Sequence, residues 1–382
     1  MVGSQRRLSR SRTERLRVAV LMGGPSSEHE VSLQGGANVA GSLDPTRFEV
    51  RPVVISRDGR WRMAPRKKAL RFRAAATTVP STLAGDGGEV APPGFDGHGT
   101  EGWPTFPGPC EGMVELKAWG ADLVFPVLHG AFGEDGTVQA LLQAAGLDFV
   151  GSGHRASAVA FDKIRTKEVL LAHDIPTPNW EVLDVSGAPV DRAECIERWI
   201  ETLGLPLVLK NPLGGSSLEV LIAKDAGEAA AALDTLMPKA EQILVEAFIE
   251  GRELTAGVLE DFRSGEPKAL PIVEIRTRGG GTFDYFQKYS AEGAEEICPA
   301  PVDFDAAAEA QRLGLEVHKL LGLRGLSRTD LRMDAEGRLY VLEVNTLPGM
   351  TERGLVPLAA REAGLAFDAL IAGLARTAAV RS

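Results

Sequence analysis

The feature that most constrains the fold of this chain is a predicted β-hairpin at residues 326–345 with polar side chains in strand positions. Two apolar runs flank the turn sequence DAEG, in which aspartate comes first and glycine last, as a type I turn favours. Successive side chains of a strand point to opposite faces, so Glu343 and Asn345 must project from the same face. The hairpin therefore presents two oxygen-bearing side chains next to each other.

The turn also predicts which residues face each other across the hairpin. Closing it with aspartate opposite glycine places Arg328 opposite Glu343 and Asp330 opposite Val341. In this register Arg328, Asp330, Glu343 and Asn345 share one face, and a slip of one residue would separate them.

Two carboxylates and an amide on one face favour a hard divalent cation, because Mg²⁺ and Mn²⁺ prefer oxygen ligands. Neither histidine nor cysteine accompanies Asp330, Glu343 and Asn345, and such a set leaves coordination positions open to phosphate oxygens. The alternative is an exposed hairpin face with a surface ion pair. The pattern favours metal-nucleotide chemistry.

The rest of the chain predicts a mixed α/β and α+β protein. An apolar strand at 18–22, a Gly-Gly-Pro turn and a helix open an α/β unit, which resumes with a strand at 121–130. Between them, residues 57–113 are rich in glycine and proline and predict an insertion of loops and short hairpins. The expected divisions are a disordered tail at 1–15, an N-terminal α/β domain at 16–151, a central subdomain at 152–246 and a C-terminal subdomain at 247–382.

Composition excludes several classes of partner. A net charge of −10 argues against nucleic acid and an anionic membrane surface, since both select a basic face. Three cysteines without a CxxC pair fit a reducing cytosol, and the apolar run VAVLM is too short for a signal segment or membrane span. We expect a cytoplasmic protein whose partners are small molecules.

Five motifs occur in the order and approximate spacing found in D-alanine:D-alanine ligases of the ATP-grasp superfamily. They are HGAFGEDG at 129–136, FDKIRTK at 161–167, GGSSLEV at 214–220, FDYFQKYS at 283–290 and LEVNTLPGM at 342–350. The chain resembles this family from about residue 16 to 376. The resemblance implies an ATP-grasp fold with an N-terminal α/β (pre-ATP-grasp) domain that caps the amino-acid pocket.

The resemblance also implies the reaction. Oxide is a poor leaving group, so ATP must first convert a carboxylate into an acyl phosphate before an amine can attack it. The expected products are D-alanyl-D-alanine for peptidoglycan, ADP and phosphate. By similarity, Asp330 and Glu343 bind one Mg²⁺ (or Mn²⁺), and Glu343 and Asn345 bind a second.

By the same similarity, nine residues contact ATP: Lys163, Lys210, Ser217, Glu246, Ala247, Phe248, Ile249, Glu253 and Lys288. The lysines at 163 and 210 are assigned to phosphates, Glu246 to the adenine amine and Glu253 to the ribose. Residues 278–293 are expected to form a lid that excludes water from the acyl phosphate. From local sequence alone, the two lysines could equally be solvated surface groups and the segment after 246 an ordinary strand end.

Eight residues are similarly assigned to the amino-acid substrates. The catalytic set is Glu28, Ser216, Tyr289, Arg328 and Gly349, and the substrate-binding set is His129, Gly354 and Leu355. Glu28 would hold the ammonium of the first D-alanine together with Ser216 and Tyr289, and Arg328 with the Gly349 N–H would stabilise the tetrahedral oxyanion. Local readings remain open: a helix-dipole charge at 28, a core histidine at 129 and a structural ion pair at 328.

The chain departs from the family pattern at several positions. Gly354 stands where a serine usually binds the carboxylate of the second D-alanine, and Arg332 stands where the family is normally apolar. Lys288 and Tyr289 in the lid favour an amine acceptor. The alternatives are a sibling ligase with a different second substrate and a non-catalytic nucleotide-binding homologue; a homodimer is left open.

Overall fold

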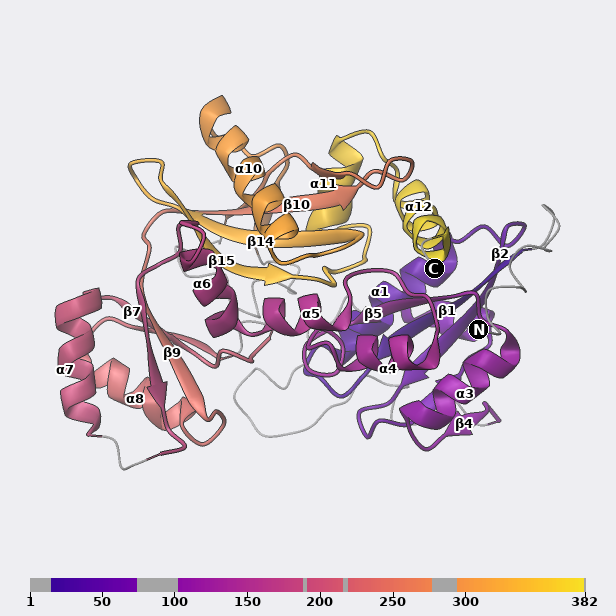
Figure 1. Ribbon diagram of the computed structural model, residues 1–382, viewed down its shortest axis with the longest axis horizontal. Coiled ribbons are helices and arrows are strands. Elements are labelled where there is room, and N and C mark those ends of the chain that lie inside the picture. Colours follow the sequence, from indigo (N-terminus) through magenta and orange to yellow (C-terminus); the bar gives the residue numbers. More distant parts are fainter. Residues whose placement is uncertain (1–14, 74–101, 188–190, 216–218, 277–293, 381–382) are drawn as a thin grey trace.

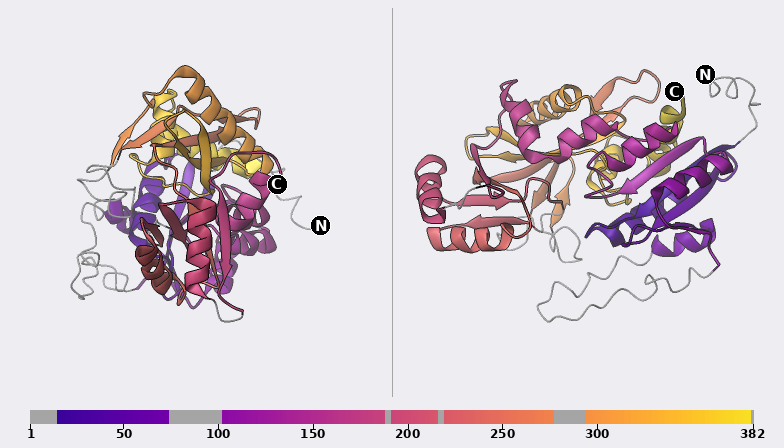
Figure 2. Two further views of the ribbon diagram at one scale, coloured as in Figure 1. Left: turned by 90° about the vertical axis from the view of Figure 1, so that its left-hand side faces the viewer. Right: turned by 60° about the horizontal axis from the view of Figure 1, so that its bottom comes forward.

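The structure, a computed structural model, describes residues 15–73, 102–187, 191–215, 219–276 and 294–380 (Figure 1). The tail predicted at 1–15 lies outside these residues except for Arg15. The described chain forms three separate β-sheets with helices packed on them. The N-terminal sheet and the four-stranded sheet lie at opposite ends of the long axis, and the six-stranded sheet lies alongside both (Figures 1 and 2).

The N-terminal sheet has the strand order β4-β3-β2-β1-β5. Its strands are β1 (Leu16–Gly23), β2 (Phe48–Ile55), β3 (Trp61–Met63), β4 (Thr105–Phe106) and β5 (Leu123–Leu128). Strand β1 runs parallel to β2 and β5, whereas β3 pairs antiparallel with β2 and β4. Part of the tract expected as an insertion at 57–113 therefore extends the sheet, and residues 74–101 lie outside the described chain.

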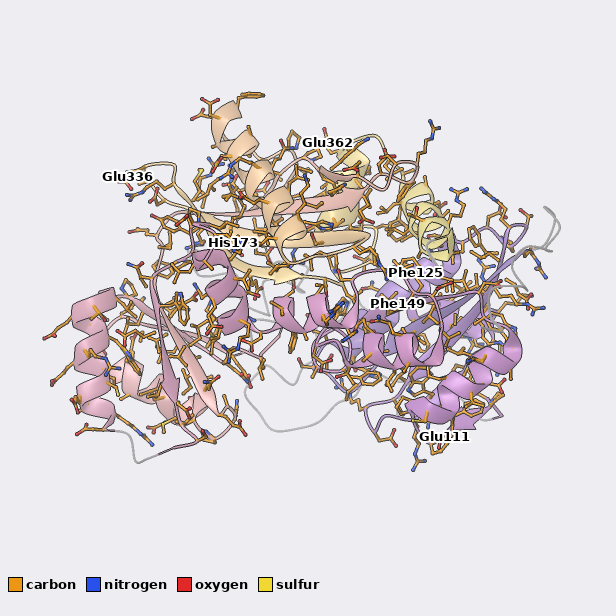
Figure 3. All side chains as sticks on the ribbon, viewed as in Figure 1. Glu111, Phe125, Phe149, His173, Glu336 and Glu362 are labelled. Atoms are coloured by element: carbon orange, nitrogen blue, oxygen red, sulfur yellow. The ribbon has the colours of Figure 1, made fainter. Side chains whose placement is uncertain are left out.

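Strand β1 is buried on both faces, which explains its continuous apolar sequence. Val18, Val20 and Met22 enter one core cluster, whereas Ala19 and Leu21 enter another on the opposite face. The covering helices are α1 (His29–Ser42), α2 (Arg66–Ala69), the 3-10 helix η2 (Leu70–Arg73), α3 (Pro109–Trp119) and α4 (Thr137–Ala145). Phe125 and Phe149 lie inside this part of the molecule, and Glu111 lies on its outer surface (Figure 3).

The four-stranded sheet is antiparallel with the order β6-β9-β7-β8. Its elements are β6 (Trp180–Asp184), α7 (Arg192–Leu203), β7 (Leu207–Lys210), β8 (Val220–Ala223), α8 (Ala226–Leu236) and β9 (Gln242–Ala247). The side chains of Asp191 and Asp225 accept hydrogen bonds from backbone N–H groups at the starts of α7 and α8, as N-caps do. Trp199 of α7 is fully buried against the sheet, so the two helices cover one of its faces.

The six-stranded sheet has the order β13-β12-β10-β14-β15, with β11 paired to β10. Its strands are β10 (Arg252–Glu260), β11 (Pro267–Ala269), β12 (Val273–Arg276), β13 (Glu295–Ile297), β14 (Leu326–Met333) and β15 (Leu339–Asn345). The associated helices are α5 (His154–Phe161), α6 (Lys163–Leu171), α10 (Phe304–Leu320), α11 (Leu355–Glu362) and α12 (Phe367–Val380). Helices α11 and α12 share a core cluster with β1 and α1, which joins this sheet to the N-terminal sheet.

The turn of the β14–β15 hairpin differs from the prediction by one residue. The Gly337 N–H donates to the Asp334 carbonyl at 3.1 Å, as expected, but the Asp334 N–H donates to the Arg338 carbonyl at 3.0 Å. Gly337 has φ +80°, so it forms a left-handed bulge after the type I turn and pairs with nothing across the hairpin. The predicted pairing of Asp334 with Gly337 is therefore wrong.

A second bulge lies nearer the polar face. The observed pairs are Arg328 with Asn345 and Asp330 with Glu343, and the register shifts between Asp330 and Leu331. The predicted pairs, Arg328 with Glu343 and Asp330 with Val341, are therefore wrong. Two shifts of one residue add up to two, which restores the side-chain parity, so the four polar side chains share one face as predicted.

Among the helices of the described residues, none combines the length and the apolar character that crossing a membrane requires.

Candidate active site

Asp330 is the centre of the polar face on the hairpin. Its carboxylate receives two hydrogen bonds from Arg328, Nε to Oδ1 at 2.9 Å and Nη2 to Oδ2 at 2.8 Å. It also accepts from Asn345 Nδ2 at 3.1 Å and from Thr255 Oγ1 of β10 at 2.7 Å. Because the amide nitrogen of Asn345 is used here, its oxygen is the atom left for a metal. Arg328 thus forms an ion pair with Asp330 of its own strand, whereas the sequence suggested an ion pair with Glu343 across the hairpin.

Glu343 connects this face to helix α6. Lys163 Nζ lies 3.2 Å from Glu343 Oε2 and donates to the Gly214 carbonyl at 2.8 Å. The Asp162 side chain accepts from two backbone N–H groups of α6 and so fixes the start of the helix. Lys163 is 8% exposed, so it is not a solvated surface lysine. It joins the predicted metal strand to the glycine-rich turn.

Lys210, at the end of β7, belongs to a buried cluster of three charges. It forms an ion pair with Glu246 Oε2, and Lys167 Nζ lies 2.6 Å from Glu246 Oε1. Burial alone would raise the pKa of Glu246, but the two lysines hold it below its ordinary value. Burial lowers the pKa of Lys167 to about 8, against the opposing effect of Glu246. Lys210 is therefore also no surface lysine.

The segment after Glu246 is held by Arg332 of β14. Arg332 Nε donates to the Ile249 carbonyl at 3.1 Å, and Nη1 lies 3.5 Å from Glu253 Oε2. The guanidinium carbon also lies 5.3 Å from the ring centroid of Phe248. Arg332, which departs from the family pattern, thus contacts three of the residues predicted to bind the nucleoside.

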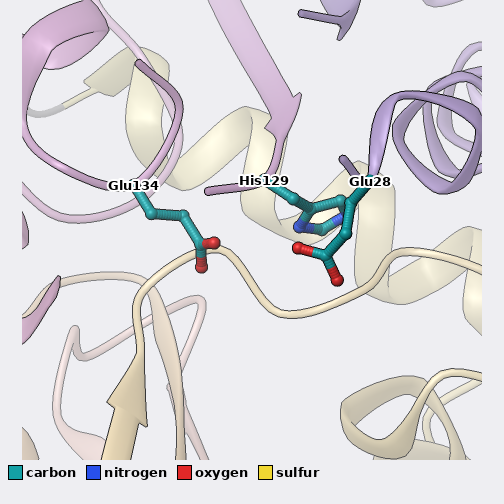
Figure 4. A group of neighbouring side chains, drawn as sticks. All are labelled: Glu28, His129 and Glu134. Carbon is teal, nitrogen blue, oxygen red and sulfur yellow. The ribbon is translucent and has the colours of Figure 1, made fainter. Parts of the chain in front are cut away.

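A second cluster forms where β1 and β5 end. Glu28 stands at the N-cap of α1, His129 follows β5, and Glu134 lies in the loop before α4 (Figure 4). Parallel neighbouring strands end at the same edge of a sheet, which brings the first two residues together. One ligand atom from each of the three side chains lies within 4.8 Å of the others. The set could hold a cation, either a metal or an ammonium group.

The electrostatics of this cluster favour the neutral forms of Glu134 and His129. Burial, followed by the charge of Glu28, raises the pKa of Glu134 to about 8, although the Gly130 N–H donates to its Oε2 at 2.8 Å. Burial lowers the pKa of His129, and no hydrogen bond to its Nε2 is found within the described residues. An incoming cation therefore finds two carboxyl groups and one nitrogen lone pair.

Family models describe nearly all of this chain. The model for the D-ala D-ala ligase N-terminus matches residues 17–152, and that for the D-ala D-ala ligase C-terminus matches residues 169–376. The chain belongs to the D-alanine–D-alanine ligase family. The predicted family and fold class, ATP-grasp with an N-terminal α/β domain, are confirmed.

Individual D-alanine–D-alanine ligases match along their whole length. The ligase of Mycobacterium sp. (strain JLS) is 37% identical over 377 residues, which cover 97% of this chain and 98% of that protein. The solved structure of the Coxiella burnetii ligase matches with a TM-score of 0.75 and 27% identity, covering 96% of this chain and 95% of that one. That of the Bacillus anthracis ligase complexed with ATP matches with a TM-score of 0.68 and 26% identity, covering 96% and 98%.

The loop predicted to bind the second substrate is closely packed. Gly354 is the N-cap of α11, and its N–H donates to the Thr351 carbonyl at 3.0 Å. A Cβ added at Gly354 would lie 2.4 Å from the Gly349 carbonyl oxygen, too close for any side chain without a shift of the loop. Leu355 turns its side chain into the core. Only its backbone remains for the predicted substrate contact.

The sequence-based prediction missed two residues of the site. Glu134 lies in the motif at 129–136, and Lys167 lies one helical turn after Lys163. A spacing of four on a helix puts both lysines on one face, a signal that could have identified Lys167. The predicted site residues Ser216, Ser217, Lys288 and Tyr289, and the whole of the lid predicted at 278–293, lie outside the described residues.

Proposed function

We propose that this protein joins two D-alanine molecules in an ATP-dependent reaction that yields D-alanyl-D-alanine, ADP and phosphate for peptidoglycan synthesis. The observation that carries the proposal is the convergence of Asp330, Glu343 and Asn345 with the buried Lys163. Membership of the ligase family supports the same reaction.

The hairpin face and α6 would bind the triphosphate end of ATP. All three groups on the face offer oxygen, which suits Mg²⁺, so Asp330, Glu343 and Asn345 would hold the metal. When bound, Mg²⁺ supplies positive charge against the phosphate oxygens. Lys163 and Lys210 would add further positive charge, which lets two anions, carboxylate and triphosphate, approach each other.

The cluster of Glu28, His129 and Glu134 would bind the first amino acid. An ammonium group has three N–H donors, and the cluster offers two carboxyl groups and an imidazole lone pair as acceptors. Holding the ammonium there directs the substrate carboxylate toward the hairpin. Its oxygen then attacks the terminal phosphorus, ADP departs, and an acyl phosphate forms.

The second half-reaction forms the peptide bond. The amine nitrogen of the second D-alanine attacks the acyl carbon and loses a proton, and phosphate leaves with the former carboxylate oxygen. Arg328 and the Gly349 N–H would stabilise the intermediate oxyanion. Arg328 now donates two hydrogen bonds to Asp330, so a metal on Asp330 would release the guanidinium for that role.

The division into parts at 16–151, 152–246 and 247–382 is included in this proposal, supported by the three separate sheets. We also propose a cytoplasmic location, where ATP is available. The homodimer left open by the sequence is tested by light scattering after size-exclusion chromatography, in which a mass near 40.7 kDa would contradict it.

The direct test is phosphate release by the purified protein with ATP, Mg²⁺ and D-alanine as the only amino acid. Release with D-alanine alone, together with the dipeptide in the product, supports the proposal. Release that requires another acceptor overturns the identity of the second substrate. Glu343→Gln should abolish release, whereas Glu336→Gln, in the exposed hairpin turn, should not change it (Figure 3).

A different second substrate is the remaining candidate, and Gly354 is the observation that favours it. Gly354 has no hydroxyl group, its backbone N–H already donates to the Thr351 carbonyl, and the adjacent Gly349 carbonyl leaves no room for a side chain. A panel of amines added at limiting D-alanine would identify such an acceptor by a mixed product.

A further inference from the structure

Lys167 is a buried charge to which the proposed reaction gives no role. Its side chain is 1% exposed, and it is among the largest fully buried side chains of the described chain. Burying an ammonium group is costly unless it is paired and hydrogen-bonded. The contacts of Lys167 should therefore reveal why a lysine stands there.

Lys167 connects three parts of the predicted nucleotide site. Its Nζ donates to Thr177 Oγ1 at 2.5 Å and to the Pro178 carbonyl at 3.1 Å, and it lies 2.6 Å from Glu246 Oε1. Thr177 Oγ1 in turn donates to the Val341 carbonyl of β15 at 2.8 Å. The ammonium group thus ties α6 to the chain entering β6, to the end of β9 and, through Thr177, to the metal strand.

The charges in this cluster do not balance as a simple pair. Glu246, which is 2% exposed, has one lysine on each carboxylate oxygen, Lys167 on Oε1 and Lys210 on Oε2. One carboxylate for two ammonium groups leaves a surplus positive charge in a buried place. If Lys210 leaves, Glu246 and Lys167 remain as a neutral pair. If Lys167 were absent, Lys210 would be the sole counter-ion of Glu246 among the described residues and could not leave without exposing Glu246 as an unpaired buried charge.

We propose that Lys167 is the permanent counter-ion of Glu246, which allows Lys210 to move from Glu246 to the triphosphate when ATP binds. The exchange frees Glu246 Oε2 to accept a hydrogen bond from the exocyclic amine of adenine. These roles of Lys210 and Glu246 rest on the function proposed above. Lys167 is a positioning residue, because it acts on the nucleotide through Glu246.

The exchange couples recognition of the base to recognition of the phosphates. A base with an oxo group in place of the amine presents a second acceptor to Glu246 and gains nothing from the freed oxygen. Helix α6 carries both ends of the coupling, because Lys163 and Lys167 lie four residues apart on one face. The first contacts the metal strand at Glu343, and the second contacts Glu246.

The test compares ATP with ITP, which lacks the exocyclic amine, in binding titrations without amino acid and in steady-state kinetics. Lys167→Met should weaken ATP binding and reduce the ATP-over-ITP preference, each by at least about tenfold, the factor for one hydrogen bond to a charged group. Lys167→Arg should keep the preference. An unchanged preference in Lys167→Met overturns the proposal.

Two controls separate this role from a structural one. Thr177→Val removes the hydrogen bonds to Lys167 and Val341 but leaves the charge, so it should lower the melting temperature and keep the ATP-over-ITP preference. Loss of the preference in Thr177→Val would show that packing, not charge, is responsible and would overturn the proposal. Lys268→Met, which removes an exposed lysine paired with Asp261, should change neither the affinity for ATP nor the ATP-over-ITP preference.

Lys210→Met keeps the proposal testable if Lys167→Met does not fold. The variant should remain folded and still bind adenosine, because Lys167 keeps Glu246 paired. The ratio of its affinity for ATP to its affinity for adenosine should fall at least about tenfold. An unfolded Lys210→Met protein, or an unchanged gain, contradicts the exchange. Binding is measured without amino acid, so the outcome of this test does not depend on whether the protein ligates D-alanine.

Discussion

Replacing Glu134 by glutamine should make the protein less sensitive to alkaline pH. Burial, followed by the Glu28 charge, raises the pKa of the Glu134 carboxyl from 4.5 to about 8 in the folded protein. A raised pKa means that the folded state binds this proton more tightly than the unfolded state does. The contribution of this proton to the free energy of unfolding is fully present below pH 4.5 and is lost as the pH rises through about 8.

The size of the effect follows from one proton per molecule. Between the two pKa values, the free energy of unfolding of the natural protein should fall relative to Glu134→Gln by at most about 1.4 kcal/mol per pH unit. Glutamine keeps an acceptor for the Gly130 N–H, which donates to Glu134 at 2.8 Å, so the two proteins should be similar near pH 5. Urea denaturation at four pH values from 5 to 8.5 measures the difference.

A difference in unfolding free energy that is constant across this pH range would refute the reasoning, since it would mean that Glu134 is not buried as a neutral acid. Glu336→Gln is the matched control. Its carboxylate lies in the exposed hairpin turn, so its curve should run parallel to that of the natural protein.

Three further predictions concern packing and pairing. In urea denaturation, His318→Gln should lose less stability than the natural protein when the pH is lowered. Burial lowers the pKa of His318 to about 4, so the stability that neutral His318 contributes is lost as the pH falls from 6.5 toward that value. The same loss of unfolding free energy at low pH in both proteins would contradict this. Arg332→Met should cost about 1–3 kcal/mol in the same assay, because Ile249 and Glu253 lose their shared donor; an unchanged midpoint would show that the contacts are not needed. Gly354→Ala should lower stability by about 1–3 kcal/mol and raise KM for the second amino acid, because its Cβ would lie 2.4 Å from the Gly349 oxygen; a variant as stable and active as the natural protein would show that the loop yields freely.

Local patterns predicted the parts of the site that depend on side-chain period and strand ends. The period of two placed Glu343 and Asn345 on one face in any register. Arg328 and Asp330 of the partner strand share that face because the two bulges shifted the pairing by an even number. The buried strand at the N-terminus and its glycine turn placed Glu28 before the first helix, but only the family resemblance assigned it to the site.

The register itself could not be predicted from the turn sequence. DAEG is compatible with a two-residue closure and with a closure in which Gly337 adopts φ +80° as an extra residue. The second bulge, near Asp330, leaves no mark in the sequence. Register depends on how the hairpin packs against β10, a strand that precedes it by about seventy residues in the chain.

Burial and charge pairing were also beyond local sequence. Lys167 is a typical exposed helix residue in composition, yet its partners come from the chain entering β6 and from β9. Arg332 departs from the family pattern, and only the fold reveals that it contacts Phe248, Ile249 and Glu253. Such roles depend on contacts between residues far apart in sequence.

The measurement that tests the central claim most directly is Mn²⁺ binding by electron paramagnetic resonance in the presence of a non-hydrolysable ATP analogue. The natural protein with the analogue should bind two Mn²⁺ ions. Glu343→Gln, which alters the carboxylate expected to contact both, should lose at least one of them, and Glu336→Gln should keep both. Equal Mn²⁺ binding by the natural protein and Glu343→Gln would contradict the claim that the hairpin face holds the metal against the triphosphate.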